Sequence, residues 1–307
     1  MEPRVGRVAA AIVLAVAWTP RSTPAAPHAA AQLDTKLIER RTGAKGALDE
    51  EEGVFKVSVP RSDLRVTAAG VRVVPAMGLT SWAAFQGSPG HVEMMGDLVL
   101  LEDQVNPVMS TALASGLQVT ALHNHFLWDS PRVMFMHIGG MGHQEALAAA
   151  VGKVFRRIEE TSGGAGDAPA AHIDPDRTTL DGSRIDGILG VKGTLVGGVY
   201  RAVFGRTTQM HGMQAGSAMG VNTWAAFAGS DDRAVVDGDF AMLESELQGV
   251  LEALRSANID VVAIHQHMTG EQPRIMFLHY WGLGSTQDLA RGLRAALDRT
   301  TARVHPR

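Results

Sequence analysis

The sequence contains no cysteine in its 307 residues. This absence excludes disulfide bonds, thiolate metal sites and a cysteine nucleophile. It also excludes the lipid-anchored amino terminus of bacterial lipoproteins, which needs a cysteine after the cleavage site, so we expect no lipid anchor. Any metal site must therefore use histidine, carboxylate or other oxygen and nitrogen ligands.

The chain also lacks runs of lysine or arginine, and its formal net charge is −4. Nucleic-acid binding needs clustered positive charge, so we expect no nucleic-acid partner. The one long apolar run, Val8 to Trp18, has 11 residues. As a helix it would cover about 16 Å, too little for a bilayer core of about 30 Å. We therefore expect no transmembrane span in the mature chain.

Residues 1–31 match the pattern of a secretory signal peptide. Arg4 and Arg7 precede the apolar run, and an alanine-rich stretch ends at Ala31. A basic start, a short apolar segment and small residues at the end are typical of cleaved signals. The sequence predicts an exported protein, periplasmic or extracellular; the alternative is an uncleaved amphipathic tail.

The rest of the chain is an internal duplication. A pattern of three histidines, a Pro-Arg pair and a phenylalanine recurs 142 residues later with identical spacing. The matching stretches are residues 78–142 and 220–284, and weaker similarity continues upstream. We predict repeat unit one over residues 32–160, a linker over 161–175 rich in Gly, Ala and Pro, and repeat unit two over 176–302.

Periodicity predicts an α+β fold for each unit, with a mostly antiparallel sheet and two or three helices on one face. Apolar residues at helical spacing predict helices over 102–115 and 144–158, and alternation predicts strands over 54–59, 71–74, 80–86, 91–101, 117–125 and 132–138. The two units could form separate domains or fuse their sheets about a pseudo-twofold axis, and both arrangements stay open. Large aromatic side chains are expected in the core: Trp82, Phe85, Trp224 and Phe227.

The histidine pattern is the feature with an evident chemistry. Side chains alternate along a strand, so His123 and His125 share a face. A hairpin pairing about Ser130 would set His123 opposite His137 and His125 opposite Phe135. The three imidazoles would then share an apolar face with Leu117, Val119, Ala121, Val133 and Phe135. The predicted metal ligands are His123, His125 and His137 in unit one, and His265, His267 and His279 in unit two.

Three neutral imidazoles on an apolar surface each need a partner, and a divalent cation supplies one. Zinc or copper is the expected transition metal, although iron, manganese and nickel also accept imidazole. Additional ligands or supporting groups could come from Asp97, Glu102 and Asn124, or from Asp239, Glu244 and Gln266. The competing interpretation is that the histidines are satisfied core residues.

Several segments resemble one family of bacterial envelope proteins, called LppY/LpqO. They are residues 102–109 (EDQVNPVM), 121–126 (ALHNHF), 131–137 and Gly140. The resemblance extends over roughly residues 33 to 300. It implies export from a bacterial cell but no defined activity and no catalytic residues. The mycobacterial namesakes are described as lipoproteins, a feature that a chain without cysteine cannot share.

Two functional hypotheses follow. The first is an exported tandem-repeat protein that binds a divalent transition metal in each unit. If that centre is catalytic, Glu102 or Glu244 is the candidate base, but the sequence names no reaction. The second is a non-enzymatic protein that binds a cell-envelope component or a small molecule and has structural histidines.

Overall fold

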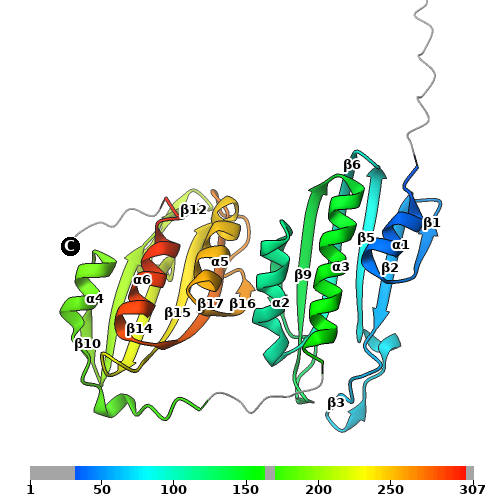
Figure 1. Ribbon diagram of the computed structural model, residues 1–307. Coiled ribbons are helices and arrows are strands. Elements are labelled where there is room, and N and C mark those ends of the chain that lie inside the picture. The colour runs from blue at the N-terminus through cyan, green and yellow to red at the C-terminus, as the bar shows by residue number, and fades with distance from the viewer. Residues whose placement is uncertain (1–31, 163–169, 302–307) are drawn as a thin grey trace, which may run out of the picture. The chain divides into compact units, whose positions relative to one another are not determined.

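The computed structural model describes residues 32–162 and 170–301. The predicted signal peptide, residues 1–31, and the middle of the predicted linker lie outside the described residues. The fold is α+β, with a twelve-stranded antiparallel sheet as its largest element. In Figure 1, α1 and α3 lie on the same side of the strands of unit one. The described part of the chain has no helix with the length and apolar character needed to cross a membrane.

The two units contain equivalent elements. Unit one comprises α1 (Thr35–Thr42), β1 (Gly46–Asp49), β2 (Val54–Pro60), β3 (Thr67–Ala68), β4 (Val71–Arg72), η1 (Pro75–Met77), β5 (Thr80–Ser88), β6 (His91–Leu101), α2 (Glu102–Ala114), β7 (Gln118–His123), β8 (Asp129–Ser130), β9 (Val133–Gly142) and α3 (Gln144–Glu160). Unit two comprises η2 (Pro175–Arg177), α4 (Gly182–Leu189), β10 (Thr194–Val196), β11 (Val199–Gly205), β12 (Thr208–Met210), β13 (Met213–Ala215), η3 (Ser217–Met219), β14 (Asn222–Gly229), β15 (Ala234–Leu243), η4 (Glu244–Glu246), α5 (Leu247–Ser256), β16 (Asp260–His265), β17 (Ile275–Gly284) and α6 (Thr286–Leu297).

The sheet joins the units through the pair β7 and β16. Its strand order is β1-β2-β5-β6-β9-β7-β16-β17-β15-β14-β11-β10. Leu122 of β7 pairs with Ile264 of β16, and these two residues occupy equivalent positions in the repeat. The main strands of the two units therefore form one continuous sheet, and a two-stranded sheet (β12-β13) and a three-stranded sheet (β4-β3-β8) are separate from it.

Reciprocal side-chain bonds support this junction. The Asn106 amide bonds the backbone N–H and C=O of Val261, at 2.8 and 3.4 Å. Its repeat equivalent, Gln248, bonds the N–H and C=O of Val119, at 3.0 and 2.9 Å. Each amide satisfies a backbone donor and acceptor that a half-buried strand would otherwise leave unpaired.

The sheet has two different faces. One face packs against the helices and forms the main core, with side chains such as Phe85, Leu98 and Met136. Side chains alternate along a strand, so those that lie between the core side chains point to the other side of the sheet, which we call the open face. A small cluster covers one end of it in unit one, where Val66, Val73 and Leu79 pack on Val99, Val133 and Phe135. Ala215 and Val221 form the equivalent cluster with Ala241, Ile275 and Phe277.

Candidate metal centres

The histidine clusters lie on the open face of the sheet. The strand register sets Trp82 of β5 opposite Asp97 of β6, and Asp97 opposite His137 of β9. Directly opposite residues in neighbouring antiparallel strands project from the same face. In unit two, Trp224, Asp239 and His279 form the same row. Each unit thus places a carboxylate beside a histidine by backbone register alone.

The register of the histidine hairpin differs from the predicted one. His137 is opposite Ala121 and His123 is opposite Phe135, a shift of two residues along β7. The predicted pairing about Ser130 is wrong because β8, which contains Ser130, pairs with β3 instead of closing a tight hairpin. A shift of two residues keeps side-chain parity, so His123 and His137 still share a face.

The predicted apolar stripe is also corrected. A β-bulge lies between Val119 and Ala121, and one extra residue switches the side of the sheet that later side chains face. Leu117 and Val119 therefore belong to the main core, whereas Val133 and Phe135 belong to the small cluster beside the histidines. Unit two has the same bulge between Val261 and Ala263.

In unit one, the Nε2 atoms of His123 and His137 are 3.1 Å apart. His123 Nδ1 lies 3.4 Å from the carbonyl oxygen of Asn124. A carbonyl oxygen only accepts, so this contact places the hydrogen on Nδ1 and leaves a lone pair on Nε2. His125 follows the end of β7, and its ring stacks on Phe135 with centroids 3.5 Å apart. His125 thus contacts Phe135 as predicted, but from the loop and not from a paired strand.

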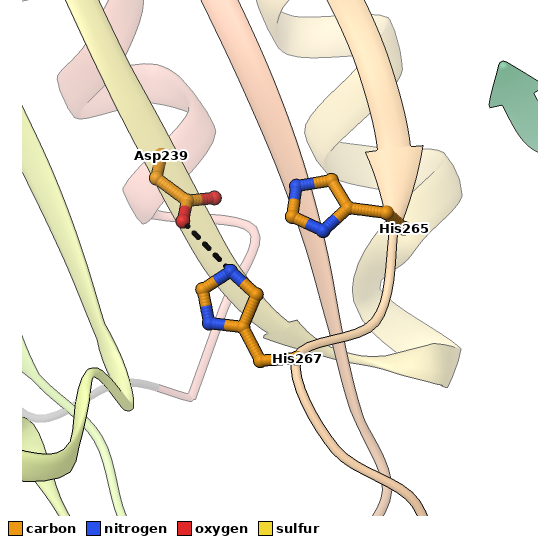
Figure 2. Close-up of side chains that lie close together, drawn as sticks. All are labelled: Asp239, His265 and His267. Carbon is orange, nitrogen blue, oxygen red and sulfur yellow. Dashed lines mark ion pairs between the residues drawn. The ribbon is translucent and has the colours of Figure 1, made fainter. Parts of the chain in front are cut away.

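Unit two brings a carboxylate and two imidazoles together (Figure 2). Asp239 projects from β15, His265 from the end of β16 and His267 from the loop that follows. The Asp239 Oδ2 atom is 3.2 Å from His267 Nε2. One ligand atom from each of the three residues lies within 4.8 Å of the others. This Asp-His-His group can hold a metal ion, because a small inward movement brings all three atoms within bonding range of about 2.1 Å.

His279 lies beside this Asp-His-His group but is not one of the three residues whose ligand atoms lie within 4.8 Å of one another. Its ring centroid is 4.7 Å from that of His265. Its Nδ1 atom lies 3.4 Å from the carbonyl oxygen of Gly238, which again leaves Nε2 as the atom with a lone pair. His267 stacks on Phe277 at 3.5 Å, the counterpart of the His125 and Phe135 contact.

Three polar atoms in these clusters are buried without a partner. They are Oδ1 of Asp97, Oδ1 of Asp239 and Nε2 of His265. In the described part of the chain these are the buried side-chain nitrogen and oxygen atoms that lack a hydrogen bond. Each such atom costs roughly 1–3 kcal/mol when nothing compensates its lost hydration.

Burial shifts the ionisation of the same groups. Desolvation raises the pKa of Asp97, although the nearby histidines His137, His125 and His123 oppose the shift. Asp239 has a raised pKa for the same reason. Desolvation also lowers the pKa of His125, and it lowers that of His265 together with the charge of His279. Burial therefore favours the neutral imidazole, the form that binds metal, at His125 and His265.

The other predicted supporting residues lie elsewhere. Glu102 begins α2, is exposed and forms an ion pair with Arg132 at 3.7 Å. Glu244 is exposed at the start of η4. Asn124 donates to the carbonyl oxygen of Phe126 at 2.9 Å, and Gln266 is exposed. Asp97 and Asp239 are the carboxylates that join the histidines.

The predicted core position is wrong for Trp82 and Trp224. Phe85 and Phe227 are buried in the main core as predicted, but the two tryptophans are half-buried on the open face. The Lys56 ammonium lies 4.0 Å from the Trp82 ring centroid, and the Arg201 guanidinium lies 4.8 Å from that of Trp224. The alternation Trp-Ala-Ala-Phe already places Trp and Phe on opposite faces, which was the available signal.

Comparison with known proteins gives a family but no activity. A family model described as Domain of Unknown Function (DUF1259) matches residues 36–157 and 183–299. No curated protein matches the chain. A trimeric bacterial microcompartment shell protein, PduB, has a similar crystal structure by one comparison, with 11% sequence identity, 82% of this chain and 89% of that chain covered, and a TM-score of 0.19. That score is too low to carry an argument.

Proposed function

The chain belongs to the family described as Domain of Unknown Function (DUF1259), in two copies, and from this premise we propose that it is a metal-binding protein. Each unit binds one divalent transition metal ion through its three histidines and the adjoining aspartate. The ligands are His123, His125, His137 and Asp97 in unit one, and His265, His267, His279 and Asp239 in unit two. Zinc or copper suits this set of imidazole and carboxylate donors.

One observation carries the proposal: the three buried polar atoms without partners all belong to these two clusters. A core histidine or aspartate would be expected to have a hydrogen-bond partner. A cation bound between Asp239 and His265 would give both orphaned atoms a ligand bond at once. It would also compensate the burial of the carboxylate, which otherwise raises its pKa.

The nitrogen positions in unit one support the same conclusion. Two nitrogens bound to one tetrahedral ion at about 2.05 Å lie about 3.3 Å apart. The observed Nε2 to Nε2 distance between His123 and His137 is 3.1 Å. Metal binding there replaces one imidazole-to-imidazole hydrogen bond and needs little side-chain movement.

Elemental analysis of the purified protein tests the proposal. After incubation with zinc or copper and removal of free metal, the wild type should retain close to two equivalents. His123→Ala and His265→Ala should each lose about one equivalent, and the double variant should retain none. The exposed His91, outside both clusters, gives the control His91→Ala. Wild-type protein without metal under all these conditions would refute the proposal.

The alternative function is a scaffold that binds an envelope component, with structural histidines. The stacking of His125 on Phe135 and of His267 on Phe277 favours it, since both rings pack beside small apolar clusters. The two functions differ in one measurement. A structural histidine should cost stability when replaced, whether or not a chelator is present, whereas a ligand should lose only the stabilisation that the metal gives.

We also propose that the protein is exported from a bacterial cell. The basic start, the apolar run and the alanine-rich end of residues 1–31 support this, together with the resemblance to LppY/LpqO proteins. Mass spectrometry of the protein from a periplasmic fraction should find a new amino terminus close to Gln32. Full-length protein retained in the cytoplasm would contradict export.

The fusion of the two units about a pseudo-twofold axis is likewise our proposal. It is supported by the pairing of the equivalent residues Leu122 and Ile264 and by the reciprocal bonds of Asn106 and Gln248. If the junction is two-fold related, Asn106→Ala and Gln248→Ala should lower the melting temperature by similar amounts. A large effect of one variant and none of the other would contradict it.

A further inference from the structure

A cation and a flat apolar floor adjoin the histidine cluster of unit one. Lys56 of β2 lies over the Trp82 ring, and Trp82 is the cross-strand neighbour of Asp97. The next row of the open face contains Ala84, Met95 and Gly139, which the register sets opposite one another. Met95 is 60% exposed although it is apolar.

This floor lies directly beside the proposed metal ligands. Met95 is two residues from Asp97 on β6, and Gly139 is two residues from His137 on β9. Residues two apart on a strand share a face and lie about 6.6 Å apart. A small molecule on the floor can therefore reach both the histidine cluster and the Lys56 ammonium.

Lys56 has a charge that the protein leaves uncompensated. Within the described ranges the Lys56 ammonium forms no ion pair, and it contacts the π-face of the Trp82 ring. Row neighbours Ala84, Met95 and Gly139 are all uncharged. A metal ion beside it, with three neutral imidazoles and one carboxylate, adds a further net positive charge.

Unit two lacks this floor. Asp237 stands at the position of Met95, and Trp281 at that of Gly139, in the same register. Asp237 brings a negative charge to the row that contains Arg201. In the same row, unit two has the Trp281 side chain at the position where unit one has Gly139 and no side chain. Arg201 and Trp224 of unit two correspond to Lys56 and Trp82. The position beside them holds the large Trp281 side chain and the negative charge of Asp237.

We propose that unit one, and not unit two, binds a small organic anion on the surface formed by Lys56, Trp82, Ala84, Met95 and Gly139. Its carboxylate or phosphate group pairs with Lys56, and its apolar body lies on the Trp82 ring and the Met95 side chain. This inference rests on the proposed function, because the bound ion adds the second positive charge that attracts the anion. It assigns the two units different roles, with ligand binding confined to the first.

The test titrates the zinc-loaded full chain with benzoate and with phenyl phosphate, and follows binding by calorimetry and tryptophan fluorescence. Benzyl alcohol, which has the ring without the charge, should bind at least tenfold more weakly than the better anion. The stronger of the two anions identifies the acid group that the site prefers. Failure of both anions to bind the wild type would overturn the proposal.

Three variants locate the site. Lys56→Met should weaken anion binding at least tenfold, while Lys192→Met, a charge control in unit two, should have no effect. Met95→Asp installs the residue of unit two and should also weaken binding at least tenfold. Wild-type affinity in both Lys56→Met and Met95→Asp would place the anion elsewhere and overturn the proposal.

Gly139→Trp copies unit two more directly. A Cβ at Gly139 meets its closest neighbour, the Met94 carbonyl oxygen, at 3.7 Å, so a side chain fits without displacing the backbone. Gly139→Trp should abolish anion binding and leave zinc content unchanged, whereas Gly139→Ala should bind the anion within twofold of wild type. Unimpaired binding by Gly139→Trp would overturn the proposal.

Zinc content measured on the same samples separates this inference from the proposed function. If zinc binds and the anions do not, the metal proposal stands and the anion site fails. If zinc does not bind, the proposed function fails. Anion binding by the metal-free chain that is lost in Lys56→Met would then show a Lys56 site independent of metal.

Discussion

Nε2 of His137 lies 3.1 Å from Nε2 of His123, close to the separation of two nitrogens on one tetrahedral ion. Because the pair is preformed, metal should stabilise the folded chain more than the unfolded one. A metal concentration 100-fold above the dissociation constant contributes about 2.7 kcal/mol per site, or roughly 5–10 °C in melting temperature. Differential scanning fluorimetry with zinc and then with excess chelator should show this rise and its reversal.

The histidine variants give that experiment its controls. His123→Ala should remove about half of the zinc-dependent rise, and His91→Ala should keep all of it. The melting temperature of His123→Ala in chelator should stay near that of the wild type. A drop in chelator as large as the drop in zinc would show that His123 stabilises the fold without metal.

Replacing the buried carboxylate of Asp97 should raise the stability of the metal-free protein and weaken its metal binding. Its Oδ1 atom has no partner, so Asp97→Asn should stabilise the metal-free protein at pH 7 by about 1 kcal/mol and should also weaken zinc binding. Burial raises the folded pKa of Asp97, so its destabilising effect is absent below the unfolded pKa of about 3.9 and appears as the pH rises through the folded pKa. The gain from Asp97→Asn should therefore vanish in acid.

Urea unfolding in chelator at pH 7 and near pH 4 measures this difference. Glu93→Gln, an exposed change on the same strand, should be neutral at both pH values. A metal-free Asp97→Asn protein that is less stable than wild type at pH 7 would mean that the carboxylate already has a stabilising partner.

Much of the fold follows from local pattern, and the site geometry depends on contacts that pattern does not contain. The bounds predicted for β6 and α2 agree with the structure to within one residue, because long alternation and helical spacing are strong signals. The pairing of β8 with β3 joins segments about 60 residues apart, and no local pattern specifies it. The hairpin register was wrong for that reason.

The bulge explains the second difference. An apolar stripe that reads continuously from Leu117 to Ala121 changes face between Val119 and Ala121, since an inserted residue leaves no mark in composition. The shared face of His123 and His137 was nevertheless predictable, because both belong to the part of the β7–β9 pairing that follows the bulge. The aspartates could be named as candidates from the sequence, but only the strand register places Asp97 opposite His137.

Removing one partner of the buried pair Arg206 and Glu246 should strongly destabilise unit two, because the other charge would stay buried without its counter-charge. The Arg206 Nη2 atom lies 2.8 Å from Glu246 Oε2, and both side chains are less than 10% exposed. Burial opposes ionisation of Glu246, but hydrogen bonds from Thr301 and Leu243 and the charge of Arg206 outweigh it and lower the pKa. Glu246→Gln should destabilise the protein by about 3 kcal/mol, because the buried guanidinium loses its counter-charge.

The pH dependence of this pair has a definite sign. A carboxyl with a lowered folded pKa stabilises the protein above its unfolded pKa of about 4.3, and the stabilisation is lost as the pH falls through the folded value. The difference in free energy of unfolding between Glu246→Gln and wild type, measured with urea, should thus be largest at pH 7 and should shrink below about pH 4. The exposed Glu244→Gln should match wild type throughout, and a gap that persists unchanged in acid would contradict the ion-pair explanation.

Gly238 should be required for the geometry of the unit-two centre. A Cβ at this position would lie 2.2 Å from the Tyr280 ring and 2.4 Å from the Trp224 carbonyl oxygen, and the backbone oxygen of that carbonyl cannot move aside. Because Gly238 precedes Asp239 and its own carbonyl contacts His279, Gly238→Ala should destabilise the protein by at least about 2 kcal/mol and lower zinc retention by up to one equivalent.

The matched control is Gly187→Ala in α4. Its Cβ meets nothing within 4 Å, and alanine favours a helix over glycine by about 1 kcal/mol. Gly187→Ala should therefore raise stability slightly and leave zinc content unchanged. Thermal unfolding and elemental analysis on the two variants decide the matter: a Gly238→Ala protein with wild-type stability and two equivalents of zinc would show that the strand beside Asp239 can shift without loss of the centre.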